Sequence, residues 1–342
     1  MSLSAPSVTP VPTHPLPMMT TPQNPKMESS MSSSATTVMR LDLKIGFIGG
    51  GQMALALAKG FMASGMVAPS KVLTSAPSDN NLMLWRQLGA NTTHENADVI
   101  MGCDVIFLAT KPHIFPAMMA GLEITGIEED PKSKLQRENG EASNPDNIIS
   151  PNTRYITTDS KLFVSVMAGV TIKSLTNALS NIAFNPRVIR AHPNTPAMVG
   201  CGCAVYSLGE GATSDDGDLI RNLFSSVGIC DQVPEYQQDA FTGMAGSGPA
   251  YIYTIIEALS DGGVRMGLPR QMASKFAAQM TMGAAKMALE SGKHTGQLKD
   301  EVTSPAGTTI RGIQVLERAG VRGAVMDAVQ ASAERAVELG KN

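Results

Sequence analysis

Apolar residues in the first two thirds of the chain gather in short runs, each closed by glycine, proline or hydroxyl residues. Short apolar runs bounded by such breakers are typical of buried strands. The expected strands are 44–49, 71–77, 104–112, 161–170, 187–196 and 203–209. Two segments between them, 52–65 and 79–89, repeat apolar residues at helical spacing. This alternation predicts a parallel sheet with helices on its faces.

Beyond residue 235 the strand pattern stops. Three segments, 239–267, 269–292 and 323–340, carry apolar residues at helical spacing with Gly or Pro at their ends. The alanine-rich stretch 275–289 suits close packing against a helix of a second chain, while a helical bundle within one chain is the alternative. We therefore expect an α/β domain over 41–235 and an all-helical substrate and dimerisation domain over 236–342.

Two polar segments lie outside these patterns. Residues 1–40 are rich in Ser, Thr, Pro and Met, which predicts a disordered tail. The segment at about 124–160 is too polar and too rich in helix and strand breakers for a core, so we expect an exposed insertion. The tail has Lys26 and Arg40 as its basic residues, which gives no support to a mitochondrial transit peptide. We expect a cytoplasmic protein, with a mitochondrial one as the alternative.

Composition narrows the class of protein. A hydrophobic content of 43% and a charged content of 17% fit a globular chain, and a net charge of −3 argues against a nucleic-acid partner. No apolar run reaches the roughly 18 residues of a membrane span. The four cysteines form no CxxC pair, so we expect buried thiols and no metal site.

The first strand ends in a glycine-rich turn, IGFIGGGQMA. Gly49, Gly51 and Ala54 give the pattern G-x-G-x-x-A between an expected strand and an expected helix, the context that a dinucleotide-binding turn requires. Gly49 permits the tight turn, Gly51 lets the backbone approach a pyrophosphate, and Ala54 allows close contact between helix and sheet. The sheet domain is therefore predicted to be of the Rossmann type.

The second strand bears on the choice of cofactor. Its end reads LTSAPSDN, with Thr74, Ser75 and Ser78 where an NAD site usually has a carboxylate. The first carboxylate of this stretch, Asp79, comes only at its seventh residue. Hydroxyl groups suit a 2′-phosphate, which slightly favours NADPH, but no arginine in this stretch neutralises the phosphate. NADPH and NADH both stay open. Lys111, at the end of the third expected strand, is a candidate for a phosphate or ribose contact.

Several longer motifs occur in one order over about 300 residues: GFIGGGQMALALAKGF, FLATKPH, HPNTP, GMAGSGPAY, DGGVRMGLPR and GQLKDEVTSPAGTTIRGI. Together they closely resemble pyrroline-5-carboxylate reductase. The resemblance implies reduction of L-Δ1-pyrroline-5-carboxylate to L-proline with NADPH or NADH, the last step of proline biosynthesis. It also implies a Rossmann domain followed by an all-helical domain that forms a homodimer, with dimers assembling into a decamer.

The resemblance assigns roles to individual residues. Cofactor-binding positions would be Ile48, Gly49, Gly50, Gly51, Gln52, Met53, Ser75, Ala76, Asn96, Ala109, Thr110, Lys111, Pro112, Val166, Met167 and Ala168. Substrate-binding positions would be Glu235, Ser304, Gly307, Thr308 and Thr309, with Thr309 also catalytic. Ala76 replaces a serine that contacts NADPH in the family, and Glu301 replaces an asparagine of some relatives, so its cofactor contact is not carried over.

The segment TSPAGTTIRG, 303–312, has a plausible chemistry. Amides near Gly307 and Thr308, with the Ser304 hydroxyl, suit a substrate carboxylate at a helix N-terminus. Thr309 could hydrogen-bond the imine nitrogen, a role that rests on the family pattern. A protonated imine is already electrophilic, so orientation is the main task. Ala306, where the family has glycine, is acceptable only with a negative φ.

Other interpretations carry less weight. A β-hydroxyacid dehydrogenase shares the domain order, but the helix that begins at GPAYIYTIIEAL has no catalytic lysine there. A non-catalytic nucleotide-binding scaffold would retain the glycine turn without needing the intact TTI segment. His192 is a possible general acid, but we expect a structural histidine. Glu257 and Asp261 are expected to be a solvated or capping pair.

Overall fold

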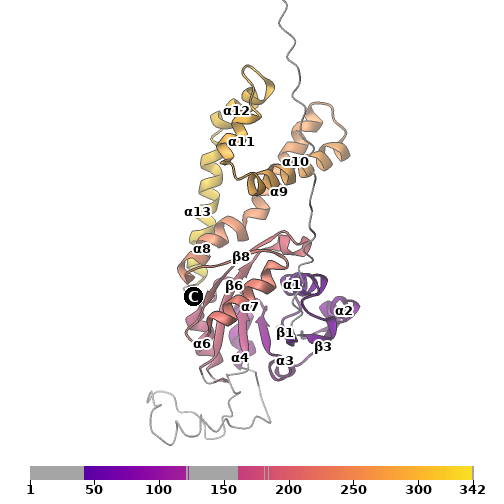
Figure 1. Ribbon diagram of the computed structural model, residues 1–342, viewed down its shortest axis with the longest axis vertical. Coiled ribbons are helices and arrows are strands. Elements are labelled where there is room, and N and C mark those ends of the chain that lie inside the picture. The colour runs from indigo at the N-terminus through magenta and orange to yellow at the C-terminus, as the bar shows by residue number, and fades with distance from the viewer. Residues whose placement is uncertain (1–41, 121, 123–160, 181, 184, 341–342) are drawn as a thin grey trace, which may run out of the picture. The chain divides into compact units, whose positions relative to one another are not determined.

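The computed structural model describes residues 42–340, apart from 121, 123–160, 181 and 184. The expected disordered tail and the expected insertion at about 124–160 therefore lie outside the described residues. The strands form one eight-stranded sheet within the described part of the chain (Figure 1). The strands are β1 (Ile45–Ile48), β2 (Val72–Ser75), β3 (Asn91–Thr93), β4 (Val105–Leu108), β5 (Leu162–Ser165), β6 (Arg187–Pro193), β7 (Gly202–Leu208) and β8 (Gly228–Gln232).

The strand order is β3-β2-β1-β4-β5-β6-β7-β8. Strands β1 to β6 all pair in parallel, as the alternating pattern predicts, and β7 pairs in parallel with β8. The pair β6–β7 is antiparallel, which corrects the expectation of a wholly parallel sheet. The connection 194–201 is too short for the crossover that a parallel return requires, so β7 turns back beside β6.

Helices of the sheet region follow the strands. They are α1 (Gln52–Ala63), α2 (Asp79–Gln87), α3 (Asn96–Gly102), α4 (Phe115–Ala120), α6 (Ile172–Leu179) and α7 (Ser214–Ser225), with short 3₁₀ turns η1 (Pro69–Lys71), η2 (Pro112–Ile114), η4 (Thr195–Val199) and η5 (Glu235–Gln237). The expected helices at 52–65 and 79–89 are thus confirmed. The sequence pattern did not predict α3, α4, α6 and α7 or the short strands β3 and β8.

Neighbouring side chains of the central strands point into two separate cores. On β4, Val105 and Phe107 pack with α1 and α7 residues, whereas Ile106 and Leu108 pack with residues of α3 and α6. Phe107 stacks on Phe47 at 4.9 Å between ring centroids and meets Phe224 edge-on. Because a strand alternates its side chains between faces, a continuous apolar run such as VIFL requires both faces to be covered.

The C-terminal part of the described chain is helical. Its elements are α8 (Gln238–Phe241), the π-helical turn η6 (Thr242–Gly246), α9 (Gly248–Arg265), α10 (Arg270–Glu290), α11 (Thr295–Glu301), α12 (Thr308–Arg318) and α13 (Val321–Leu339). The helices expected at 269–292 and 323–340 are confirmed. The single helix expected over 239–267 is wrong, because the π-helical turn at TGMAG interrupts it.

The sequence has no apolar run long enough for a membrane span, and the helices of the structure can be compared with that. Among the described residues, no helix combines the length and the apolar character that crossing a bilayer requires.

Candidate active site

The turn after β1 is fixed by its own backbone. Gly49 has φ +105°, and a Cβ atom there would lie 2.8 Å from the Ala109 carbonyl oxygen, so only glycine fits. The Gly49 amide donates to the Ser75 carbonyl at 3.0 Å. The carboxyl ends of β1, β2 and β4 are therefore held together at this one residue.

The first turn of α1 faces an open space. Gly51 is the N-cap of α1, no side chain caps the helix, and a Cβ atom at Gly51 would meet nothing within 4 Å. Ala54 is fully buried against the sheet, as the close helix contact requires. Free backbone amides at a helix N-terminus attract anions. The turn 48–53 thus fits the pyrophosphate of a dinucleotide, with Ile48 buried beneath it.

The ribose end of the site lies where β2 and β3 finish. The Ser75 hydroxyl donates to the Asn96 side-chain oxygen at 2.7 Å, and the Ala76 amide donates to the Thr93 carbonyl at 3.3 Å. The structure thus brings the predicted positions Ser75, Ala76 and Asn96 together. Thr74 and Ser75 are completely buried, which corrects the idea that both offer hydroxyls to a 2′-phosphate.

A second correction concerns arginine at this end of the site. The guanidinium Nη2 of Arg86, from the second half of α2, donates to Asp79 Oδ1 at 2.6 Å. An arginine therefore does lie beside the end of β2, although the stretch LTSAPSDN contains none. The sequence around the strand end did not reveal it because the two partners lie seven positions apart along α2.

The segments expected to line the nicotinamide half also meet. The Ala109 amide donates to the Ile48 carbonyl at 2.9 Å, and the Thr110 hydroxyl contacts the Met167 sulfur at 3.4 Å. The Val166 amide donates to the Leu108 carbonyl, which places 166–168 next to 109–112. Lys111 is exposed at the start of η2.

An apolar cavity of about 640 Å³ opens beside these segments. Its walls include Pro112 of η2, Phe115 at the start of α4, Ala168 after β5, and Leu339 at the end of α13. A Cβ atom on Gly169 would lie 3.4 Å from the Leu339 Cβ atom, so the last helix packs directly on the loop after β5. The C-terminal helix therefore forms part of the wall next to the predicted nicotinamide positions.

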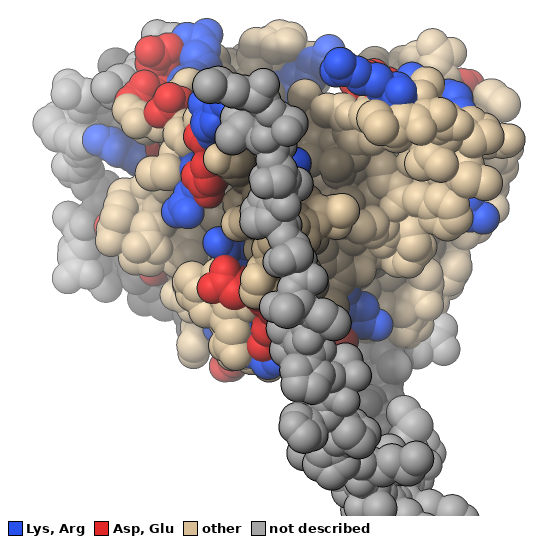
Figure 2. All heavy atoms as spheres, turned by 90° about the horizontal axis from the view of Figure 1, so that it is seen from above, with Lys and Arg blue, Asp and Glu red and all other residues tan. Residues whose placement is uncertain are grey.

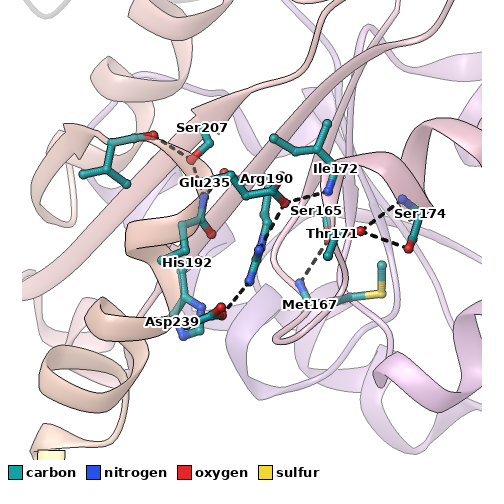
Figure 3. A network of polar contacts seen from close by, with 12 residues as sticks. Ser165, Met167, Thr171, Ile172, Ser174, Arg190, His192, Ser207, Glu235 and Asp239 are labelled. Carbon is teal, nitrogen blue, oxygen red and sulfur yellow. Dashed lines mark hydrogen bonds and ion pairs between the residues drawn. The ribbon is translucent and has the colours of Figure 1, made fainter. Parts of the chain in front are cut away.

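Glu235 belongs to a network around a buried arginine (Figure 3). Arg190 on β6 is 3% exposed and donates from Nη1 to Glu235 Oε1 at 3.1 Å and from Nη2 to Asp239 Oδ1 at 3.3 Å. The same Glu235 oxygen accepts the Ile172 amide at 2.7 Å, at the start of α6. Glu235 therefore ties β6 to α6, and a cavity of about 610 Å³ opens beside it.

His192 occupies a sheltered position on β6. Its Nδ1 lies 3.3 Å from the Thr242 hydroxyl, and its ring packs edge-on against Phe241. Burial, with a smaller contribution from Arg190, lowers the pKa of His192 to about 4. The imidazole is neutral near pH 7, which fits the expected structural histidine rather than a general acid.

The loop before α12 has the geometry of a second anion site. Gly307 is the N-cap of α12, no side chain caps that helix, and the Gly307 amide donates to the Ser304 carbonyl at 3.1 Å. Thr308 is exposed and Thr309 is half-buried. Ala306 has φ +57°, so the expectation of a negative angle is wrong, and the loop holds an L-residue in a left-handed conformation.

The loop does not join the sheet edge within one chain. Among the described residues, the hydrogen bonds of segment 303–312 to residues outside its own helix α12 reach Lys299 and Asp300. Ser304, Gly307, Thr308 and Thr309 are thus grouped together, but no hydrogen bond links them to the cofactor positions or to Glu235. Within the described residues of one chain, the cofactor positions form one group and the loop positions form another, and no hydrogen bond joins the two groups.

The helical region leaves many apolar side chains exposed, and Figure 2 shows broad surface stretches without charged residues. Helix α12 buries no residue, and α10 buries only Ala273 and Ala277. Exposed apolar residues of this region include Ile252, Tyr253, Leu259, Met272, Phe276, Met280, Met282, Met287, Ile310, Val315, Leu316 and Met326. So many exposed apolar side chains on α9, α10, α12 and α13 indicate a protein interface.

A dinucleotide turn at a parallel sheet, followed by a helical region, defines an NAD(P)-dependent oxidoreductase. A family model described as "Pyrroline-5-carboxylate reductase dimerisation" matches 235–339, and one described as "NADP oxidoreductase coenzyme F420-dependent" matches 44–134. Pyrroline-5-carboxylate reductase 3 of Mus musculus is 39% identical over 87% of this chain and 96% of its own length. Pyrroline-5-carboxylate reductase 2 of Homo sapiens is 41% identical over 87% of this chain and 84% of its own length.

Solved structures agree with these relatives. The Plasmodium falciparum pyrroline carboxylate reductase with NADP bound has a TM-score of 0.70 and 28% identity, covering 88% of this chain and 99% of that one. The enzyme from Coxiella burnetii has a TM-score of 0.70 and 31% identity over 88% and 99%. The chain belongs to the pyrroline-5-carboxylate reductase family.

The depressed pKa of His192 makes stability depend on pH. The unfolded chain takes up a proton near pH 6.5, whereas the folded chain resists it down to about pH 4. The free energy of unfolding should therefore fall between these two values as pH decreases, by at most about 3 kcal/mol from this group. Urea unfolding at pH 7 and pH 4.5, at one protein concentration, measures the effect.

The matched pair of variants is His192→Gln and His113→Gln, since His113 is exposed. We expect His192→Gln to lose less stability than the parent between the two pH values, and His113→Gln to behave like the parent. Equal acid sensitivity of all three proteins would contradict the assignment.

Proposed function

We propose that this chain catalyses the NAD(P)H-dependent reduction of L-Δ1-pyrroline-5-carboxylate to L-proline, the last step of proline biosynthesis. The observation that carries the proposal is that a chain of this family has an uncapped, glycine-headed helix N-terminus at each of the two predicted anion sites, at Gly51 and at Gly307. The first suits the cofactor pyrophosphate and the second suits the carboxylate of a small substrate. A bound reduced nicotinamide supplies the hydride.

The chain's own groups orient the substrate. The Gly307 amide is bonded to the Ser304 carbonyl, so the expected pair Gly307 and Thr308 is replaced in this proposal by the amides of Thr308 and Thr309. These amides, with the Ser304 hydroxyl, bind the carboxylate at the positive end of α12. The Thr309 hydroxyl hydrogen-bonds the ring nitrogen and fixes the face of the C=N bond that receives the hydride. The C=N carbon gains the hydride pair, and the protonated nitrogen becomes a neutral amine. No side chain has to supply a proton during the transfer.

Glu235 completes the pocket in this proposal. Its Oε1 is occupied by Arg190 and by the Ile172 amide, while its side chain stays one-third exposed. A carboxylate held in this way offers its second oxygen to the cationic imine or to the product amine. The fixed ion pair with Arg190 limits the net negative charge that the substrate carboxylate meets.

We propose that the complete site forms between two chains. The support is the apolar surface of α9, α10 and α12, together with the match of 235–339 to a dimerisation domain. The loop 303–312 of one chain would then cover the cofactor edge of its partner. By the same family resemblance, we propose that dimers assemble into decamers. The two basic residues of segment 1–40, Lys26 and Arg40, give a transit peptide no support, so we propose a cytoplasmic location, with a mitochondrial one as the alternative.

The Thr309 role is tested by Thr309→Ala. Loss of one hydrogen bond that orients the reacting group should lower kcat/KM by about 10- to 100-fold, while the Kd for NADPH changes by less than about twofold. Steady-state kinetics and equilibrium cofactor titration measure the two effects. Thr295→Ala, at the exposed start of α11, serves as the control and should keep parent turnover. Unchanged turnover of Thr309→Ala would reject the role.

Assembly is tested by placing charge on the apolar face of α10. Phe276 and Met280 are 57% and 52% exposed in the single chain, and Phe276→Glu with Met280→Glu should produce a monomer. Turnover should then fall by about 10²-fold because the loop is misplaced, while cofactor binding persists. Analytical ultracentrifugation and kinetics give the two readouts. Met83→Glu on α2 is the control, and full activity of a proven monomer would contradict a shared site.

A further inference from the structure

Three polar side chains meet at the ribose end of the cofactor site. Asp79 begins α2, Arg86 lies near the end of the same helix, and His94 follows β3. Arg86 Nη2 donates to Asp79 Oδ1 at 2.6 Å, and His94 Nε2 lies 3.8 Å from the same oxygen. Each of the three side chains is about half exposed. The family resemblance assigns no role to any of them.

Both nitrogen-bearing side chains are anchored to the strand ends. Arg86 Nε donates to the Thr92 hydroxyl at 3.0 Å, which fixes the direction of the guanidinium fork. His94 Nδ1 lies 2.8 Å from the Ala76 carbonyl oxygen. Since a carbonyl oxygen only accepts, Nδ1 carries the hydrogen and Nε2 faces Asp79. The cluster is therefore held in place before any ligand binds.

The glycine turn lies against this end of α2. A Cβ atom on Gly50 would lie 3.7 Å from the Ala76 Cβ and 3.7 Å from the Asn81 Cβ. Asp79 stands between these two positions in the chain. A dinucleotide with its pyrophosphate on the turn and its ribose at the end of β2 presents its 2′ position to this end of α2. The residues present thus fit the adenosine half of NADH and of NADPH.

The strand itself offers little for a 2′-phosphate. Thr74 and Ser75 are completely buried, and Ala76 has no polar side chain. Beyond the strand, Ser78 keeps an exposed hydroxyl, which can donate or accept a hydrogen bond but carries no charge. The charge-based discrimination at this position therefore falls to Asp79 and Arg86. The Asp79 carboxylate repels a 2′-phosphate and also occupies the Arg86 fork, which is the natural phosphate ligand in the cluster.

We propose that Asp79 is the residue that sets the ratio of NADPH affinity to NADH affinity, by holding Arg86 in an ion pair that competes with the 2′-phosphate. Arg86 is the latent phosphate ligand and becomes available when Asp79 is neutralised. This inference rests on the proposed function only through the cofactor, so it is tested by binding and not by proline formation.

The chain supplies its own reporter for binding. Trp85 is the sole tryptophan, is completely buried, and donates from Nε1 to the Gly50 carbonyl in the glycine turn at 3.3 Å. Its emission overlaps the absorption of reduced nicotinamide, so titration with NADPH or NADH should quench it. The Kd for each cofactor follows from the same signal in the same full-length oligomer.

We expect Asp79→Asn to tighten the Kd for NADPH by about fivefold and to leave the Kd for NADH within about twofold, the scale of an exposed charge interaction. Arg86→Met should raise the Kd for NADPH by about fivefold and leave the Kd for NADH unchanged, because the repulsion between Asp79 and the 2′-phosphate is then no longer offset by the arginine. In the Arg86→Met background, neutralising Asp79 should tighten NADPH binding by less than it does in the parent, because only the direct repulsion is relieved and the phosphate ligand is gone. Lys71→Met, at the amino end of β2, is the control and should change neither Kd.

Three results would overturn the proposal. An unchanged ratio of the two Kd values in Asp79→Asn would show that this carboxylate does not discriminate. A higher Kd for NADH with an unchanged Kd for NADPH in Asp79→Asn would assign Asp79 to the ribose diol instead. Tightening of NADPH binding by Asp79→Asn that is as large in the Arg86→Met background as in the parent would exclude Arg86 as the ligand. A protein that binds both cofactors with the expected shifts but forms no proline would leave the inference standing and would contradict the proposed substrate.

Discussion

The edge of the sheet where the cofactor positions lie, at the carboxyl ends of β1, β2 and β4, depends on one backbone constraint. That constraint is the positive φ of Gly49. Its amide is bonded to the Ser75 carbonyl, and its Cα lies so close to Ala109 that a side chain would strike backbone. That one residue therefore fixes the ends of β1, β2 and β4 relative to one another. The pyrophosphate, ribose and nicotinamide positions each belong to one of these ends. A side chain at Gly49 would disturb all three, whereas most changes along the loops would disturb one.

The sequence predicts the parts of the fold that burial dictates. Strands β1, β4 and β5 are covered on both faces, so each is a fully buried and largely apolar run that can be found without an alignment. The strands β3 and β8 lie at the two edges of the sheet and are partly exposed, and their short polar sequences carry no such signal. The family motifs, not periodicity, gave the candidate site its residues.

Features that depend on geometry between distant or irregular residues escape a reading of the sequence. The π-helical turn at 242–246 keeps apolar residues on either side of it, so the pattern reads as one continuous helix. Ala306 adopts a positive φ because the loop geometry outweighs a local cost of about 1–2 kcal/mol. Arg86 reaches Asp79 because the two residues lie about two turns apart on one face of α2, which the residues at the strand end do not reveal by themselves.

The helical region has little core of its own, and this links stability to chemistry. Among the described residues, α9 buries only Ser260 and α12 buries none, while large apolar side chains of both stay exposed. Helices with so little buried surface need a partner to offset their ordering entropy. The helix that lacks a buried face, α12, also carries the uncapped N-terminus of the proposed carboxylate site. The contact that orders this helix would therefore also order the substrate loop, and a folded but unpaired chain would hold cofactor without a finished active site.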